Sequence, residues 1–142
     1  MERLENTFKK YLIRIMGTRW DVQSHEDRYS EGIPDLSFGF DSINGWIELK
    51  QIKNMPKNET IIIKPAKYTP EQINWIRRRG KKGGWCFVFV KVGKSLYFLF
   101  SWDAARDIKD GMTLQSYRSR SLASWEGTVV AEELLSALRG GS

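Results

Sequence analysis

An apolar stretch from Trp85 to Val92 constrains the fold more than any other feature of this sequence. It reads WCFVFVKV, so β-branched and aromatic residues dominate it and Lys91 alone carries a charge. A strand that is apolar on both faces belongs inside a sheet, with other layers packed on each side. The sequence therefore predicts an α/β fold built around a covered central strand.

Two helices are expected to cover that strand. Apolar residues recur at helical spacing from Glu2 to Met16 and predict an amphipathic helix that Gly17 ends. Thr69 and Gln72 have the spacing of a capping box around Pro70, which suits the first position of a helix. This second helix is expected to close at Gly80.

Strand signals occupy much of the remaining chain. An Asn44–Gly45 pair predicts a hairpin turn between two of the strands. A helical turn over 101–108 and a C-terminal helix over 129–138 follow. The further strands are expected at 20–23, 36–40, 46–53, 61–64 and 95–100. This order predicts one α/β domain spanning 1–142, with a mixed central sheet flanked by helices, a core over about 2–100 and a C-terminal extension over 101–142.

Composition restricts the setting and the partners. The net charge of +6 favours a polyanionic partner, most often nucleic acid. No segment approaches the roughly 20 apolar residues of a membrane span, and the charged N-terminus lacks the pattern of a secretory signal. One cysteine allows no internal disulfide. We therefore expect a cytoplasmic protein without a membrane partner.

Charged residues on the expected strand 46–53 form the candidate site. Side chains alternate along a strand, so Glu48 and Lys50 emerge on the same face. The hairpin folds this strand back along residues 36–40, which brings Asp35 close to Glu48 or Lys50. Such a pair of carboxylates suits Mg²⁺, with Mn²⁺ as a substitute. The Leu49 carbonyl is a further candidate ligand, and Lys50 could orient water and stabilise charge on a phosphate.

The motif Pro34-Asp35 followed by Glu48-Leu49-Lys50 resembles the signature of the PD-(D/E)xK nuclease superfamily. Residues 28–36 and 68–77 are similar to the VRR-NUC and archaeal Holliday-junction-resolvase branch. The resemblance covers about residues 2–92. It implies a restriction-endonuclease-like fold, a metal-dependent DNA endonuclease and no small-molecule cofactor beyond the metal.

The same resemblance implies a further acidic residue in the first helix. Glu5 lies at the edge of the apolar stripe and Glu2 points away from it, so Glu5 is preferred as a catalytic residue. Each could also be a favourable acid at a helix N-terminus.

Several polar residues are candidates for holding the nucleic-acid backbone. Gln72 matches a glutamine that the superfamily often places on this helix, although its capping box explains it equally well. The basic run after it exceeds what a helix C-terminus requires. The candidates are Arg28, Ser30, Lys53, Gln72, Arg77, Arg78, Arg79, Lys81 and Lys82.

The sequence thus predicts a nuclease acting on branched or double-stranded DNA, such as a junction or a flap. By resemblance it acts as a homodimer, and its length suits a phage or bacterial protein. Three alternatives stay open: a sequence-specific restriction-type nuclease, a nucleic-acid-binding module that does not cleave, and an interaction protein whose motif is accidental.

Overall fold

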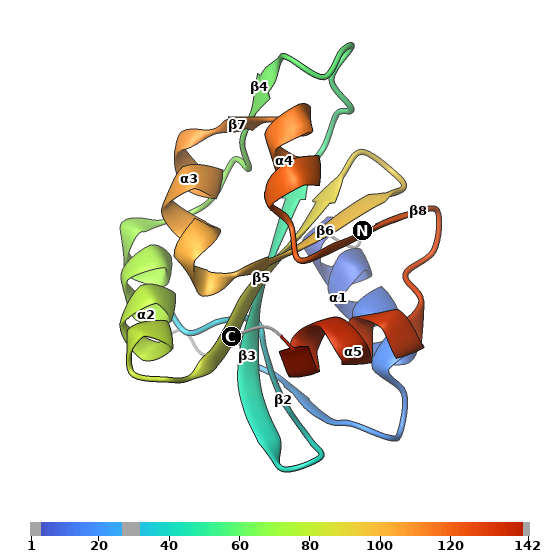
Figure 1. The fold of residues 1–142 in the computed structure, drawn as a ribbon, viewed down its shortest axis with the longest axis vertical. Coiled ribbons are helices and arrows are strands. Elements are labelled where there is room, and N and C mark those ends of the chain that lie inside the picture. The colour runs from blue at the N-terminus through green and yellow to red at the C-terminus, as the bar shows by residue number, and fades with distance from the viewer. Residues whose placement is uncertain (1–3, 27–31, 141–142) are drawn as a thin grey trace.

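The computed structural model describes residues 4–26 and 32–140. A six-stranded mixed sheet runs through the molecule in the order β1-β2-β3-β5-β6-β8 (Figure 1). β3 and β5 are parallel, whereas the other neighbours are antiparallel. The strands are β1 Asp21–Ser24, β2 Leu36–Phe40, β3 Ile43–Ile52, β5 Trp85–Val92, β6 Leu96–Ser101 and β8 Ala123–Glu126, with a separate pair β4 Ile62–Ile63 and β7 Met112–Thr113. The prediction of an α/β fold with a mixed sheet is confirmed.

Helices cover both faces of this sheet (Figure 1). Two of them, α1 and α5, pack on one face around Phe8, Leu12 and Leu134. On the other face, α2, α3 and α4 surround a core that includes Ile76 and Tyr117. The helices are α1 Leu4–Met16, α2 Pro70–Lys81, α3 Ala105–Asp110, α4 Leu114–Arg120 and α5 Ala131–Gly140, with a 3-10 turn, η1 Trp102–Ala104, before α3.

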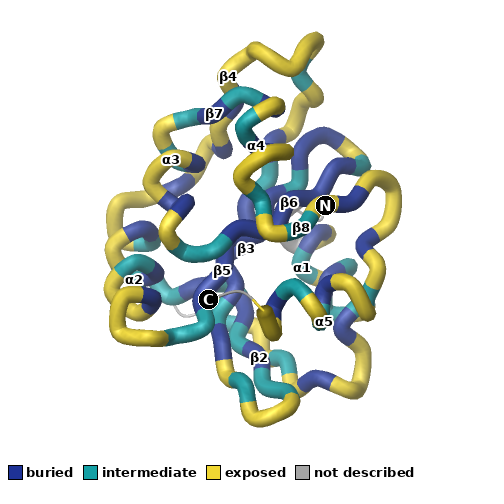
Figure 2. The backbone as a smooth tube through the Cα atoms, viewed as in Figure 1, coloured by how far each residue is buried: buried dark blue, intermediate teal, exposed yellow. Residues whose placement is uncertain are grey.

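β5 is the covered central strand that its sequence predicts (Figure 2). Its residues from Cys86 to Val90 are fully buried. Cys86, Val88 and Val90 belong to the core under α2, whereas Phe87 and Phe89 belong to the core under α1. The side chains on both faces of β5 are therefore buried, as expected of a strand between two helical layers.

The β2–β3 hairpin forms as predicted, but its turn is not at Asn44–Gly45. Asp41 and Ser42 occupy the two-residue turn, both with positive φ, between the paired residues Phe40 and Ile43. Gly45 lies inside β3, where an added Cβ would sit 2.4 Å from the Trp85 carbonyl oxygen and 2.5 Å from the Phe38 ring. Close packing, and not turn geometry, therefore accounts for this glycine.

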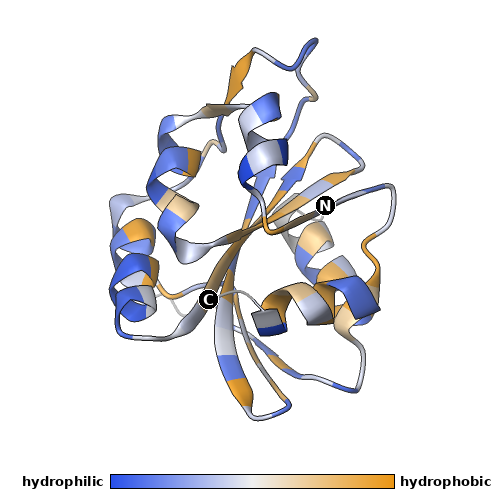
Figure 3. Ribbon diagram, in the orientation of Figure 1, coloured by the Kyte–Doolittle hydropathy of each residue, from blue (hydrophilic) through white to orange (hydrophobic). Residues whose placement is uncertain are grey.

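α2 begins as predicted and ends later than predicted. Both hydrogen bonds of the capping box between Thr69 and Gln72 are present, with Pro70 in the first turn. The helix continues through Gly80 to Lys81. A Cβ on Gly80 would lie 2.3 Å from the Trp102 indole, so this position allows η1 to approach the helix. Figure 3 shows α2 as largely hydrophilic with hydrophobic patches.

The segment after Phe100 adds elements that the sequence pattern did not predict: β7, α4 and β8. β8 pairs with β6 and forms one edge of the sheet. Tyr117 in α4 and Trp125 in β8 each enter one of the two cores. The last third of the chain therefore contributes to both helical layers and to the sheet.

Candidate active site

The strand register places Asp35 beside Glu48. Leu36 pairs with Ile47 at the end of the β2–β3 ladder, so Asp35 directly precedes the last pair. One carboxylate oxygen of Asp35, Oδ2, accepts a hydrogen bond of 2.8 Å from the Leu49 backbone N–H. The Asp35 carbonyl accepts another, 2.9 Å long, from the His25 backbone. Asp35 is thus fixed directly before β2 begins, beside the part of β3 that extends beyond its pairing with β2.

A tight approach between a loop and a helix fixes the segment before Asp35. Gly32 has a φ of 90°, and a Cβ there would lie 2.4 Å from the Glu71 carbonyl oxygen in the first turn of α2. Only glycine combines this backbone conformation with this contact. The sequence Gly32-Ile33-Pro34-Asp35 therefore passes directly over the N-terminus of α2.

Glu48 is a carboxylic acid buried in the middle of β3, with 2% of its surface exposed. Burial, and then the negative charge of Asp35, raise its pKa from 4.5 to about 8 against the opposing effect of Lys50. Within the described residues, its Oε2 atom has no hydrogen-bond partner, although the Lys50 ammonium lies 3.3 Å away. Two carboxylates that disfavour each other's charge form a site suited to a cation.

Lys50 is buried on the same face as Glu48, with 7% of its surface exposed. Its Nζ donates to the Lys67 carbonyl over 2.5 Å and to Gln72 Oε1 over 2.9 Å. The ring of Tyr68 lies 4.6 Å from the same nitrogen. These contacts hold the ammonium group beside the carboxylate pair.

Gln72 serves two neighbours at once. Its Oε1 accepts from the Thr69 backbone, which closes the capping box, and also from Lys50. The two explanations that the sequence offers for Gln72, a helix cap and a residue near the motif, are therefore compatible. The start of α2 is tied directly to the candidate site.

Sequence reasoning assigned no role to Tyr68, which the structure places in the site. Its side chain is 5% exposed, and its hydroxyl has no hydrogen-bond partner among the described residues. Burial, then the charges of Glu48 and Asp35, raise its pKa well above the ordinary value. An apolar residue directly before a capping box is a known signal for packing at a helix start, and it could have identified this residue.

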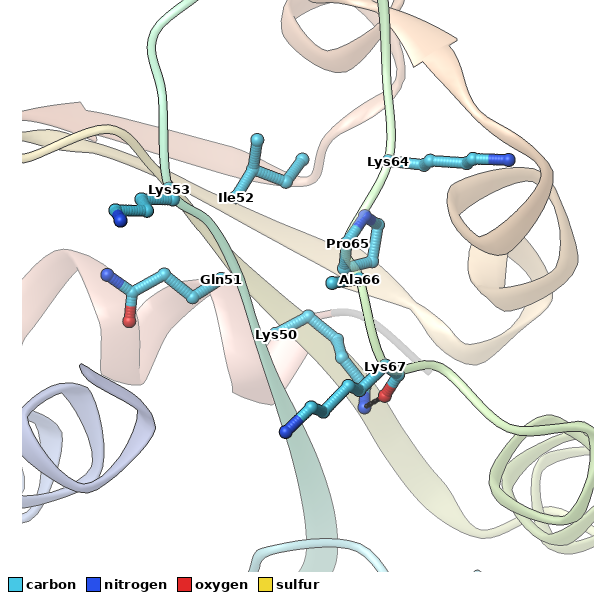
Figure 4. Close-up of a pocket in the computed structure, with 8 residues that line it drawn as sticks. All are labelled: Lys50, Gln51, Ile52, Lys53, Lys64, Pro65, Ala66 and Lys67. Carbon is cyan, nitrogen blue, oxygen red and sulfur yellow. Dashed lines mark hydrogen bonds between the residues drawn. The ribbon is translucent and has the colours of Figure 1, made fainter. Parts of the chain in front are cut away.

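The other predicted residues are not gathered at this point. Arg28, Ser30 and the side chain of Glu5 lie outside the described residues. α1, which carries Glu5, packs on the face of the sheet opposite to Glu48 and Lys50. Lys53 lines a pocket that begins at Lys50 (Figure 4).

The basic run of α2 lies at the far end of the helix from Gln72. From Gln72 to Lys81 the helix rises about 13 Å. Arg77 lies 6.0 Å from the Trp102 ring, and Arg79 lies 4.7 Å from the Trp75 ring. Arg78, Arg79, Lys81 and Lys82 are exposed. The run is thus separate from the carboxylates and partly engaged with aromatic rings.

The carboxylates of Asp35 and Glu48 are oxygen ligands of the kind that a hard divalent cation takes. Within the described part of the chain, three or more Asp, Glu, His or Cys side chains do not gather into a metal-binding group. Backbone oxygen could add to the pair, because the N–H and C=O of one strand residue point to the same edge. The Leu49 carbonyl therefore faces the edge on which Asp35 accepts from the Leu49 N–H.

Within 4–26 and 32–140, the helices are too short or too polar to span a membrane.

Comparison with known proteins gives a similarity in structure. No protein-family model and no curated protein match the sequence. Among solved structures, the chain is similar to Hjc of Archaeoglobus fulgidus, described as a Holliday junction resolvase from an archaeal hyperthermophile. The two share 11% sequence identity with a TM-score of 0.48, over 78% of this chain and 96% of that one.

Proposed function

We propose that this protein is a Mg²⁺-dependent endonuclease that hydrolyses phosphodiester bonds in DNA. One observation carries the proposal: Asp35, Glu48 and Lys50 meet at the point where β3 extends beyond β2. Burying the Glu48 carboxylate and the Lys50 ammonium beside the half-buried Asp35 costs free energy that a purely structural role would avoid with apolar residues. Ionisable groups with perturbed pKa values are typical of functional sites.

The residues present fit a divalent cation. Glu48 has a buried oxygen without a hydrogen-bond partner among the described residues, and burial together with the charge of Asp35 raises its pKa, which a bound cation would lower. Asp35, Glu48 and the Leu49 carbonyl would hold the ion, and Mn²⁺ would substitute for Mg²⁺. When bound, the ion would polarise the scissile phosphate and lower the pKa of a coordinated water.

The protein side chains would then divide the remaining work. The Lys50 ammonium, held by Lys67 and Gln72, would orient the attacking water and stabilise negative charge on the phosphate oxygens. Because Lys50 is held before substrate arrives, little reorganisation is needed at the moment of reaction. Tyr68 would keep bulk water away from this ammonium.

The substrate class rests on the sequence resemblance to the junction-resolvase branch. We propose branched DNA, a homodimer with one site for each of two strands, and Glu5 as an additional acidic group. Arg28, Ser30 and the basic residues of α2 would contact the DNA backbone without reading sequence.

The test is cleavage of end-labelled DNA. A four-way junction, a flap and a linear duplex would each be incubated with Mg²⁺, Mn²⁺ or EDTA. We expect cutting with either metal and none in EDTA, with paired cuts on opposite strands of the junction. Asp35→Asn, Glu48→Gln and Lys50→Ala should each lower the rate by about 100-fold or more, by analogy with the loss of a charge-stabilising group.

Lys9→Ala is the matched control, because it removes a lysine of α1 to which no contact with metal or DNA is assigned. It should cut at the wild-type rate. Tight binding without cutting in any metal would replace the nuclease with a binding module. Cutting of plain duplex at one fixed sequence would instead indicate a restriction-type enzyme.

A further inference from the structure

A basic pocket opens next to the candidate active site (Figure 4). It has a volume of about 220 Å³ and lies between the end of β3 and the extended segment that follows β4. Its lining residues are Lys50 to Lys53 on one side and Lys64 to Lys67 on the other. Lys50 belongs to both places, because its Nζ contacts Glu48 and the Lys67 carbonyl.

The charge of this pocket is positive, and Lys53, Lys64 and Lys67 are exposed. Among the residues that the structure describes, no acidic side chain lines the pocket. The ion pairs found among the described residues engage other cations, namely Arg19, Lys50, Arg118, Arg120 and Arg139. The three exposed lysines therefore present free ammonium groups to a ligand.

The ammonium groups are not all equally placed. In Figure 4 the side chains of Lys53 and Lys67 extend toward the same side of the pocket, whereas Lys64 points the opposite way. Lys53 and Lys67 are therefore the pair suited to hold one anion.

We propose that this pocket binds a backbone phosphate of the DNA substrate, next to the scissile phosphate. This inference rests on the proposed nuclease function and adds the direction in which one strand leaves the site. A strand rises about 3.4 Å per residue, so Lys53 lies about 10 Å beyond Lys50 along β3. Duplex DNA carries one phosphate per about 3.4 Å of axis on each strand. The bound phosphate thus lies within about three nucleotides of the cut.

Lysine suits such a contact. Its ammonium is a flexible point charge that binds phosphate oxygens without demanding one geometry. Contacts of this kind fix the position of the backbone and carry no sequence information. The pocket would therefore set where the strand lies relative to Asp35 and Glu48, and would do so for any sequence.

The first test is the salt dependence of DNA binding in EDTA, where no cutting occurs. Lys53→Ala/Lys67→Ala is compared with Lys9→Ala/Lys10→Ala, which removes the same charge from α1, a helix that lines no part of the pocket. Each phosphate contact contributes about 0.9 to the slope of log affinity against log salt. Because the two lysines hold one phosphate, we expect the pocket variant to lose about 0.9 from this slope. The control should keep it.

The second test locates the phosphate. Uncharged methylphosphonate linkages replace, one at a time, the three phosphates on each side of the cut. We expect one position at which the neutral linkage weakens binding by the wild type about tenfold, as for the loss of a charged hydrogen bond. The same linkage should leave binding by the Lys53→Ala/Lys67→Ala protein unchanged. Because both lysines are exposed, the variant should melt as the wild type does.

The outcomes separate the two proposals. A wild type that neither binds nor cuts DNA removes the nuclease and the pocket together. In another outcome, the wild type cuts DNA while the Lys53→Ala/Lys67→Ala protein keeps the wild-type salt dependence of binding and the wild-type response to methylphosphonate linkages. That result overturns the pocket proposal and leaves the nuclease proposal standing. Inorganic phosphate that shifts the NMR signals of Lys53 and Lys67, without any methylphosphonate effect, would identify a site for free anions and also overturn it.

Discussion

At the scale of single residues, the burial of Glu48 makes stability depend on pH. Its pKa is about 8 in the folded, metal-free protein and near the ordinary value of 4.5 when unfolded. The folded state therefore binds the proton more tightly. This contribution to stability is complete below about pH 4.5 and is lost as the pH rises through 8. We expect the free energy of unfolding of the metal-free protein to fall by a few kcal/mol between pH 5 and pH 9, and its melting temperature to fall with it.

Divalent metal should reverse that trend, because it binds the deprotonated carboxylate. Calorimetry with Mg²⁺ should show a larger rise in melting temperature at pH 9 than at pH 5. Glu48→Gln removes the titrating group and should flatten the pH dependence. A wild type that melts at the same temperature across this range, with and without Mg²⁺, would contradict the assignment of a protonated Glu48.

Asp35, Glu48 and Lys50 show how much of the geometry of the site can be predicted from the sequence. The common face of Glu48 and Lys50 follows from strand alternation, and the hairpin brings Asp35 to them, so this geometry was predictable. The contacts of Lys50 with the Lys67 carbonyl and Tyr68 were not. They depend on how the segment after β4 crosses β3, which no local pattern encodes.

At the scale of secondary-structure elements, two glycines do not have the role that the sequence predicts for them. Glycine commonly marks turns and helix ends, so the sequence predicts a turn at Gly45 and a helix end at Gly80. In the structure each instead lies where another group packs within 2.5 Å of a would-be Cβ: Trp85 against Gly45, and Trp102 against Gly80. Long periodic elements such as α1 and β5 were predicted correctly, since their patterns depend only on local geometry.

Gly80→Ala tests the packing explanation. Helix propensity alone would stabilise α2 by about 1 kcal/mol. The new methyl group would overlap the Trp102 ring near its attachment point, and such overpacking costs about 1–3 kcal/mol. We expect a net loss of stability in urea unfolding, whereas Asn74→Ala, at an exposed position of the same helix, should be neutral or slightly stabilising. A more stable Gly80→Ala protein would show that η1 can move away from α2 to make room for the methyl group.

At the scale of the whole molecule, the last third of the chain is part of the core. Val129, Leu134 and Leu138 are buried on the α1 face of the sheet. Arg19 near α1 also pairs with Glu132 of α5 over 2.5 Å. The sequence predicts a helix over 129–138, where α5 lies, and a helical turn over 101–108, where η1 and the start of α3 lie. It does not predict β7, α4 and β8, because these short elements carry too few residues to show a period.

Leu134→Ala tests whether the layer formed by α1 and α5 only stabilises the fold or also positions the candidate active site. Leu134 is fully buried, so the cavity should lower the free energy of unfolding by about 3 kcal/mol. Val130→Ala, at a residue that is 44% exposed, should cost well under 1 kcal/mol. Because α5 packs on the face opposite to Glu48 and Lys50, DNA cleavage by the folded Leu134→Ala protein at 25 °C should match the wild type. A folded variant with strongly reduced cleavage would mean that the α1–α5 layer positions the site, with α1 and its Glu5 as the first elements to examine.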